Sequence, residues 1–146
     1  SKLVEAALEV LDNRIKEKKI KLIKDGWKDS VLLNADPDLM EQAIYGLLAN
    51  AIDASLESDT LEINIINNRD RIEIQIQDSG SGLPFEPKPG NLAPGPSTKR
   101  YGTGLGIPIA FKICQKHNWQ LDFKTKEGEG TKAIIIAPIK SVKGFS

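Results

Sequence analysis

The hydrophobic positions near the N-terminus recur at helical spacing. They form one stripe between residues 1 and 19, made of Val4, Leu8, Leu11 and Ile15, and charged side chains occupy the opposite face. The spacing predicts an amphipathic helix from the first residue, so we expect further chain upstream of it. The basic run from Arg14 to Lys24 is typical of a solvated helix end that leads into an edge strand, and a docking patch is the alternative.

A second helix is predicted between Pro37 and about Leu56. Asp36 can cap this helix, and Pro37 suits its first position. The apolar face consists of Leu39, Met40, Ala43, Ile44, Leu47, Leu48, Ala51 and Ile52. Before the helix, the short β-type runs 20–23 and 31–33 predict a hairpin or a loose strand pair.

Alternating apolar residues on both sides of a polar turn predict an antiparallel hairpin. The strands carry Leu61, Ile63 and Ile65, then Ile72, Ile74 and Ile76, and residues 67–70 form the turn. If the second set points into the core, Asp78 has the same inward parity. Burying an unpaired carboxylate costs several kcal/mol, so Asp78 needs a partner; a capping aspartate at the strand end is the alternative.

Residues 84–101 lack a hydrophobic period and contain five prolines. A loop of this length inside a compact domain is typical of a lid or a binding segment, and glycine pairs flank it on both sides. After it, a helix is predicted at 105–117, strands at 119–124 and 132–137, and a tight turn at 128–131. Cys114 and His117 are interpreted as a packed thiol and a solvated or dipole-stabilised imidazole.

Composition narrows the function classes. With 146 residues and 40% hydrophobic content, the chain suits one domain, 1–146. Twenty basic residues balance twenty acidic ones, so no net field favours nucleic acid or an anionic membrane, and an anion site must be local. No apolar stretch approaches the roughly 20 residues that span a bilayer. The single cysteine suits a reducing compartment, so we expect a domain that faces the cytoplasm, whether or not its parent protein is anchored in a membrane.

Three polar stretches carry the candidate chemistry. Residues Gly102 to Gly106 read Gly-Thr-Gly-Leu-Gly and precede a helix, where backbone N–H groups and the helix dipole bind anions such as phosphate. The second stretch is a polar strip along the helix that starts at Pro37: Gln42, Gly46, Asn50 and Asp53. Glycine and asparagine are unfavourable within a helix, which indicates a site, although an edge asparagine bonded to a loop is the alternative. The third stretch, Asp78 to Gly82, reads Asp-Ser-Gly-Ser-Gly.

In this order and spacing, these motifs resemble the ATP-binding catalytic domain of bacterial histidine kinases. That domain belongs to the GHKL superfamily, which also includes DNA gyrase, mismatch-repair ATPases and a heat-shock chaperone. Residues 46–54 resemble the N box, and the glycine boxes are matched by residues 78–82, 102–106 and 128–131. A dinucleotide-binding interpretation of the glycines fails, because a loop and not a strand precedes them.

The resemblance implies a role for each matching position. Asn50 supplies a neutral oxygen to Mg²⁺ and forms the catalytic set with Lys99 and Arg100, which neutralise phosphate charge from the lid. Asp78 accepts a hydrogen bond from the adenine amino group, and Thr131 supports that end. The expected ATP contacts are Asn50, Asp53, Asp78, Gly80, Gly82, Lys99, Gly102, Thr103, Gly104, Leu105, Gly106 and Thr131.

The implied fold is α/β, a two-layer sandwich in which three helices cover one face of a mixed five-stranded sheet. The implied function is transfer of the γ-phosphoryl group of MgATP to a histidine on a separate helical domain, as in a two-component sensor kinase. The implied partners are that upstream phosphoacceptor domain, a response regulator and a second copy of the parent protein, with no nucleic acid. Two alternatives remain open: an ATP-regulated switch of the anti-sigma type, and a hydrolysing GHKL ATPase.

Two positions depart from the family pattern. Gly46 stands where histidine kinases usually carry asparagine, and where hydrolysing relatives place a glutamate four residues before the Mg²⁺ asparagine. The phenylalanine-rich box expected near the end of the lid is reduced to residues 92–99, Leu-Ala-Pro-Gly-Pro-Ser-Thr-Lys. The first departure predicts weak hydrolysis, because glycine offers no general base.

Overall fold

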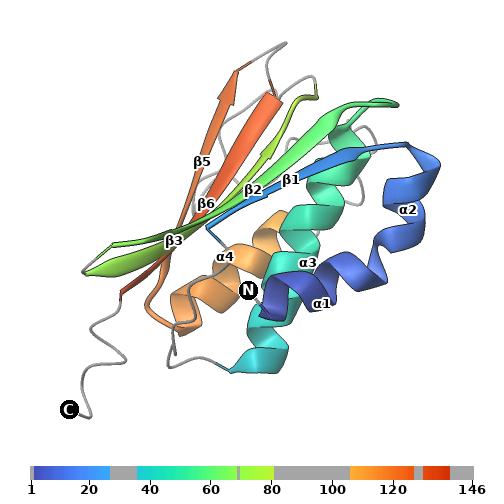
Figure 1. The fold of residues 1–146 in the computed structure, drawn as a ribbon. Helices are drawn as coiled ribbons and strands as arrows, with labels where there is room; N and C mark the ends of the chain where they lie inside the picture. The colour runs from blue at the N-terminus through green and yellow to red at the C-terminus, as the bar shows by residue number, and fades with distance from the viewer. Residues whose placement is uncertain (1, 27–35, 69, 81–105, 127–129, 139–146) are drawn as a thin grey trace.

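In the computed structural model, helices cover one face of a five-stranded sheet (Figure 1). The structure describes residues 2–26, 36–68, 70–80, 106–126 and 130–138. The strands are β1 (Lys21–Asp25), β2 (Thr60–Asn67), β3 (Arg71–Asp78), β5 (Gln120–Lys126) and β6 (Gly130–Pro138). The helices are α1 (Lys2–Val10), α2 (Asp12–Glu17), α3 (Pro37–Ala54) and α4 (Gly106–Lys116). The predicted two-layer fold with a mixed sheet is confirmed.

The sheet has the strand order β1-β2-β3-β6-β5. β1 runs parallel to β2, and the other neighbouring strands are antiparallel. The predicted hairpin is confirmed as β2 and β3, in which Ile63 pairs with Ile76 and Leu61 with Asp78. By contrast, β1 has its described partner in β2, 35 or more residues away, a pairing that the sequence did not predict. Its proposed partner, residues 31–33, lies outside the described residues.

The first predicted helix is bent rather than straight. Leu11 separates α1 from α2 with φ −92° and ψ 3°, although hydrogen bonds from Leu11 N to Ala7 O and from Ile15 N to Leu11 O continue across the bend. Leu11 is buried, and no proline or glycine stands near it, so local propensity did not indicate the bend. The two halves serve different neighbours: α1 packs on α3, whereas α2 reaches the C-terminal end of α3.

Helix α3 is the central helix of the covering layer. It contacts α1, α4 and β3, and its apolar face is buried as predicted. Asp36 caps it through Oδ1, which accepts hydrogen bonds from the backbone N–H groups of Asp38 at 3.0 Å and Leu39 at 3.2 Å. The helix ends at Ala54, two residues before the predicted end, and Ser55 is its C-cap in an extended conformation.

The alternation along β3 separates core from solvent. Ile72, Ile74 and Ile76 are buried, whereas Glu73, Gln75 and Gln77 are only partly so. Asp78 continues the inward set and is 3% exposed, which confirms the parity argument. The core therefore places one carboxylate at its edge, where β3 ends beside α3.

Candidate nucleotide-binding site

The Asp78 carboxylate is held by two backbone N–H groups. Its Oδ1 accepts from Gly80 N at 2.9 Å and from Thr131 N at 3.2 Å, so the carboxylate is both inward-facing and a strand-end cap. Burial raises the pKa of the Asp78 carboxyl above its ordinary value, and these two donors oppose the rise. Within the part of the chain that the structure describes, both bonds reach Oδ1, which leaves Oδ2 for a ligand.

The start of β6 closes one side of this carboxylate. Gly130 has φ +97°, and a Cβ there would collide with the backbone carbonyl of Asp78, so only glycine fits this position. Thr131 is 6% exposed, and its hydroxyl lies 3.0 Å from the hydroxyl of Thr125 on β5. The structure therefore brings Asp78 and Thr131 together, as the expected adenine end requires.

Gly80 joins this end to helix α3. A Cβ on Gly80 would collide with the carbonyl of Ala54, the last residue of α3. The close approach places the C-terminal end of α3 against the segment that follows Asp78. Asn50 and Asp53, both half-buried, lie on the last turns of that helix.

Asp53 is not an isolated carboxylate. Its Oδ1 forms an ion pair with Arg14 Nη2 of α2. In the same place, Lys18 Nζ donates to the carbonyls of Ile52 at 2.8 Å and Ser55 at 3.0 Å. Sequence reasoning interpreted the basic run containing both cations as a solvated helix end or a docking patch. Their spacing of four residues beside buried Ile15 was the available signal that both face the same side of the fold.

Gly46 has a packing role. A Cβ at Gly46 would lie 3.1 Å from Cα of Gly106, and a Cβ at Gly106 would lie 2.8 Å from the carbonyl oxygen of Gly46. Helices α3 and α4 therefore cross with their backbones nearly in contact, one turn before Asn50. This contact brings the N-terminus of α4 beside the polar strip, and it gives a physical reason for glycine at position 46.

The remaining predicted contacts lie outside the described residues. They are Gly82, Lys99, Arg100, Gly102, Thr103, Gly104 and Leu105, together with the lid at 84–101. Their roles stay predictions. Among the described residues, no three histidine, cysteine, aspartate or glutamate side chains gather as a metal cluster.

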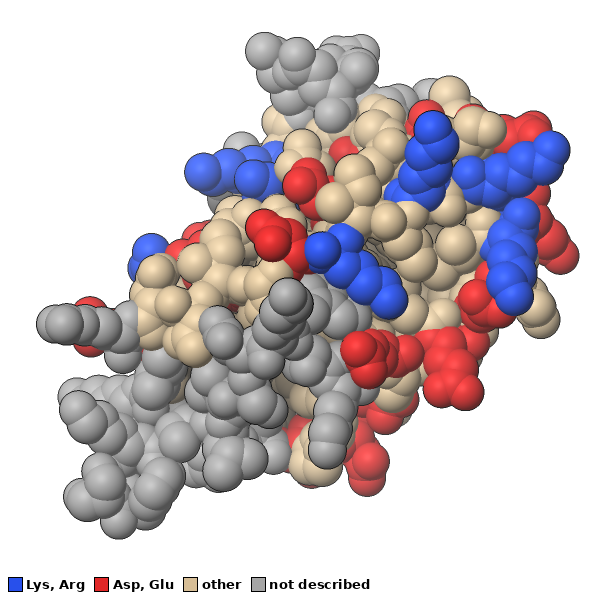
Figure 2. Space-filling view, in the orientation of Figure 1, with Lys and Arg blue, Asp and Glu red and all other residues tan. Residues whose placement is uncertain are grey.

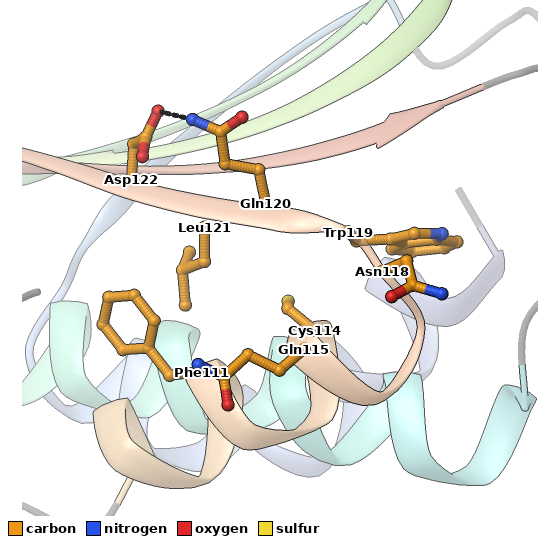
Figure 3. A pocket seen from close by; sticks show the side chains of 8 residues that line it. All are labelled: Phe111, Cys114, Gln115, Asn118, Trp119, Gln120, Leu121 and Asp122. Atoms are coloured by element: carbon orange, nitrogen blue, oxygen red, sulfur yellow. Dashed lines mark hydrogen bonds between the residues drawn. The ribbon is translucent and has the colours of Figure 1, made fainter. Parts of the chain in front are cut away.

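A separate cavity of about 270 Å³ lies between α4 and β5. Figure 3 shows Phe111, Cys114 and Leu121 between the helix and the strand, while Gln120 and Asp122 point to the other side of β5 and share a 2.8 Å hydrogen bond. This cavity is at the C-terminal end of α4, whereas Gly106 is at the other end. It contains none of the predicted site residues. Burial raises the pKa of the Cys114 thiol to about 11, which supports its interpretation as a packed thiol.

The described surface carries both signs of charge. On the face in Figure 2, basic and acidic side chains of the described residues are interspersed, and the whole chain has 20 basic and 20 acidic residues. None of the described helices has the length and apolar character needed to cross a membrane.

Comparison with known proteins identifies the family. Residues 35–141 match the model for histidine kinase-, DNA gyrase B-, and HSP90-like ATPases. Because this match covers most of the chain, the chain belongs to that ATPase family. The proteins below that resemble this chain are named as a sporulation kinase, a sensor protein and a histidine kinase.

Two curated relatives come from Bacillus. The chain is 29% identical to sporulation kinase C of Bacillus subtilis (strain 168), over 90% of this chain and 30% of that protein. It is 31% identical to the sensor protein DegM of Bacillus sp. (strain B21-2), over 79% of this chain and 31% of that protein. The chain thus spans about a third of the length of these relatives.

Solved structures share the fold. A nucleotide-free catalytic domain of histidine kinase ThkA has a TM-score of 0.79 at 25% identity, covering 94% of this chain and 92% of that chain. ThkA in complex with the response regulator TrrA has a TM-score of 0.75 at 20% identity, covering 94% of this chain and 39% of that chain.

Proposed function

We propose that this chain is the catalytic domain of a sensor histidine kinase, which binds MgATP and transfers its γ-phosphoryl group to a histidine on a separate helical domain. The observation that carries the proposal is the buried Asp78 carboxylate at the end of β3, whose Oδ1 is held by Gly80 and Thr131 and whose Oδ2 has no partner among the described residues. Family membership and the histidine kinase relatives support the same activity.

Asp78 would select adenine through its second oxygen. A buried carboxylate oxygen can accept a hydrogen bond from the amino group of adenine, whereas guanine presents a carbonyl oxygen at the same position, which repels the carboxylate. A hydrogen bond to a charged group contributes about 1.5–3 kcal/mol, which corresponds to roughly ten- to a hundredfold in affinity.

Asn50, Asp53 and Gly106 would serve the phosphate end. Asn50 on α3 offers a neutral oxygen, which suits Mg²⁺ because this ion takes few protein ligands and keeps phosphate and water oxygens. The backbone at Gly106 begins α4, and a helix N-terminus favours an anion. When bound, Mg²⁺ supplies charge neutralisation at the phosphates. The loop residues Gly102 to Leu105 and the basic pair Lys99 and Arg100 would complete the site.

The proposal extends to partners outside this chain. The acceptor histidine would lie on an upstream phosphoacceptor and dimerisation domain, and the phosphoryl group would pass on to a response regulator. ThkA, which shares the fold, has been solved with its response regulator TrrA. The domain would face the cytoplasm within a homodimeric parent protein.

The packing of Gly46 favours a kinase over a hydrolysing ATPase. A general base is expected one turn before Asn50, and that position is glycine, with the backbone of Gly106 against it. A switch protein that binds ATP without transferring its γ-phosphoryl group remains the second candidate. Adding the phosphoacceptor domain distinguishes the two, because only a kinase would phosphorylate it.

Calorimetry tests the nucleotide site. Wild type should bind MgATP at least about tenfold more tightly than MgGTP, and Asp78→Asn should lose most of that preference. Asp122→Asn is the matched control, because Asp122 lies on β5 at the remote cavity. Equal affinity of the wild type for the two nucleotides would refute the adenine assignment.

A further inference from the structure

Two cations of the N-terminal helical segment hold the C-terminal end of α3. Arg14 pairs with the Asp53 carboxylate, and Lys18 donates to the carbonyls of Ile52 at 2.8 Å, Asp53 at 3.4 Å and Ser55 at 3.0 Å. The last carbonyls of a helix have no partner within the helix, so Lys18 satisfies groups that would otherwise need water. We call the contacts made by Arg14 and Lys18 the α2 clamp.

The α2 clamp contacts α3 directly after Asn50, the predicted metal ligand. Asp53 follows Asn50 by three residues, so the two side chains lie on neighbouring positions of one helix edge. Arg14 engages Oδ1 of Asp53, and no other described residue bonds to that carboxylate. Among the described residues, the second oxygen is left without a partner, and we infer that it orders water beside Asn50.

The clamp is a poor candidate for a purely stabilising feature. The side chains of Arg14 and Asp53 are 41% and 29% exposed, and ion pairs this accessible contribute little to folding because water screens them. Holding a long arginine side chain in one geometry also costs conformational entropy. We therefore expect this pair to affect the position of the Asp53 carboxylate more than the stability of the fold.

We propose that Arg14 is a positioning residue of the nucleotide site. It aims Asp53 at the water shell of the Mg²⁺ that Asn50 would bind, and together with Lys18 it fixes the turn of α3 that follows Asn50. The inference rests on the proposed function, because it requires MgATP to bind here. It also makes nucleotide binding and the docking of α2 mutually dependent, since linkage between two such events is reciprocal.

The test compares two uncharged substitutions on the same helix. Arg14→Gln removes the clamp's guanidinium, whereas Lys16→Gln removes a cation whose 2.9 Å ion pair with Asp12 lies within α2 itself. The full chain is titrated with ATP by calorimetry at a series of Mg²⁺ concentrations, and thermal melting confirms that each variant is folded.

Arg14→Gln should weaken MgATP binding about tenfold, in the range found when groups that orient metal ligands are removed, and should lower the affinity for Mg²⁺ in the ternary complex. Lys16→Gln should match the wild type. Arg14→Lys, which keeps the charge, should recover part of the loss, and Arg14→Gln combined with Asp53→Asn should be no worse than the weaker-binding single variant.

Each outcome decides the inference. Arg14→Gln with wild-type affinity and Mg²⁺ dependence overturns it, and so does an equal loss in Lys16→Gln, which would reveal only an effect of net charge. A wild type that binds no MgATP overturns the proposed function and this inference together. A wild type that binds, with no effect of Arg14→Gln, overturns the inference alone.

Discussion

At the scale of single residues, burial of the Asp78 carboxylate lowers the stability of the ligand-free fold and prepares an acceptor for a ligand. Its burial raises the pKa of the carboxyl, because the core penalises the ionised form of the group. Gly80 and Thr131 supply two N–H donors but not enough to cancel the cost of burial. A ligand that donates to Oδ2 would offset that cost.

Asp78→Asn should therefore leave the ligand-free protein as stable as the wild type, or make it more stable, at pH 7. A raised pKa in the folded state means that the folded carboxyl binds more protons than the unfolded one, so its contribution to stability is present below the ordinary value of 3.8 and is lost as pH rises through the folded-state pKa. The gap between variant and wild type should be smallest below pH 3.8 and grow above it. Melting curves across this range measure it, and a wild type that gains on the variant as pH rises would contradict the assignment.

Cys114 provides a residue-scale test of packing. Its thiol is 1% exposed, and burial raises its pKa from 9.0 to about 11. Two pKa units lower the thiolate population roughly a hundredfold, and thiolate is the reactive form. The native protein should react with a thiol reagent at pH 8 at least about a hundredfold more slowly than the urea-unfolded protein. Comparable rates in the two states would show that α4 opens readily.

The sequence predicted the environment of a residue correctly where that environment depends on neighbouring positions of the chain. The inward position of Asp78 followed from the alternation along β3, because every second side chain of a strand points to the same face of the sheet. The partner of Asp53 did not follow, because Arg14 is 39 positions away and only the packing of α2 brings it there. The Asn50 and Asp53 roles stay predictions.

At the scale of elements, the crossing of α3 and α4 shapes the site. Gly46 and Gly106 allow the two backbones to touch, so the N-terminus of α4 sits beside the polar strip. At the other end of α4, His117 Nε2 accepts from the backbone N–H of Asp36 at 3.0 Å, and its Nδ1 donates to the Ile113 carbonyl at 2.8 Å. The helix is thus fastened to α3 at both ends.

Alanine at the two glycines should affect stability unequally. At Gly46, better helix propensity contributes up to about 1 kcal/mol and offsets the 3.1 Å contact, so Gly46→Ala should melt near the wild type. At Gly106 the new Cβ would lie 2.8 Å from a backbone oxygen, and overpacking of this kind costs about 1–3 kcal/mol. Urea unfolding of both variants measures the difference. Gly106→Ala as stable as Gly46→Ala would mean that the crossing is looser than described.

Helices, strands and their contacts were predictable where the interacting residues lie close together in the sequence. The cap of α3 and the β2–β3 hairpin were correct because each depends on a few adjacent residues. The bend at Leu11 and the parallel pairing of β1 with β2 were not foreseen, because both are decided by contacts with distant segments. Tertiary packing overrides local propensity at such places.

At the scale of the whole molecule, the structure predicts slow ATP hydrolysis. Glycine at position 46 offers no acceptor, and Asp53 is engaged by Arg14. A positioned base contributes roughly 10²–10⁴-fold in rate, so nucleotide should persist at the site. Phosphate release at saturating MgATP should be slow and should change little in Asp53→Ala. Rapid wild-type turnover that collapses in this variant would favour the hydrolysing ATPase.

Transfer to histidine should require a second domain, because the only histidine of this chain stands in the wrong place. His117 follows α4, about 16 Å along the helix axis from Gly106 at 1.5 Å per residue, and both of its ring nitrogens are engaged by Asp36 and Ile113. Neither nitrogen can reach a γ-phosphate at the other end of the helix without breaking those bonds. Incubation with radiolabelled MgATP should leave this chain unlabelled, and addition of its upstream phosphoacceptor domain should produce acid-labile label on that domain in both wild type and His117→Gln. Acid-labile label on this chain that disappears in His117→Gln would contradict the expectation, and binding without transfer to the added domain would favour the ATP-regulated switch.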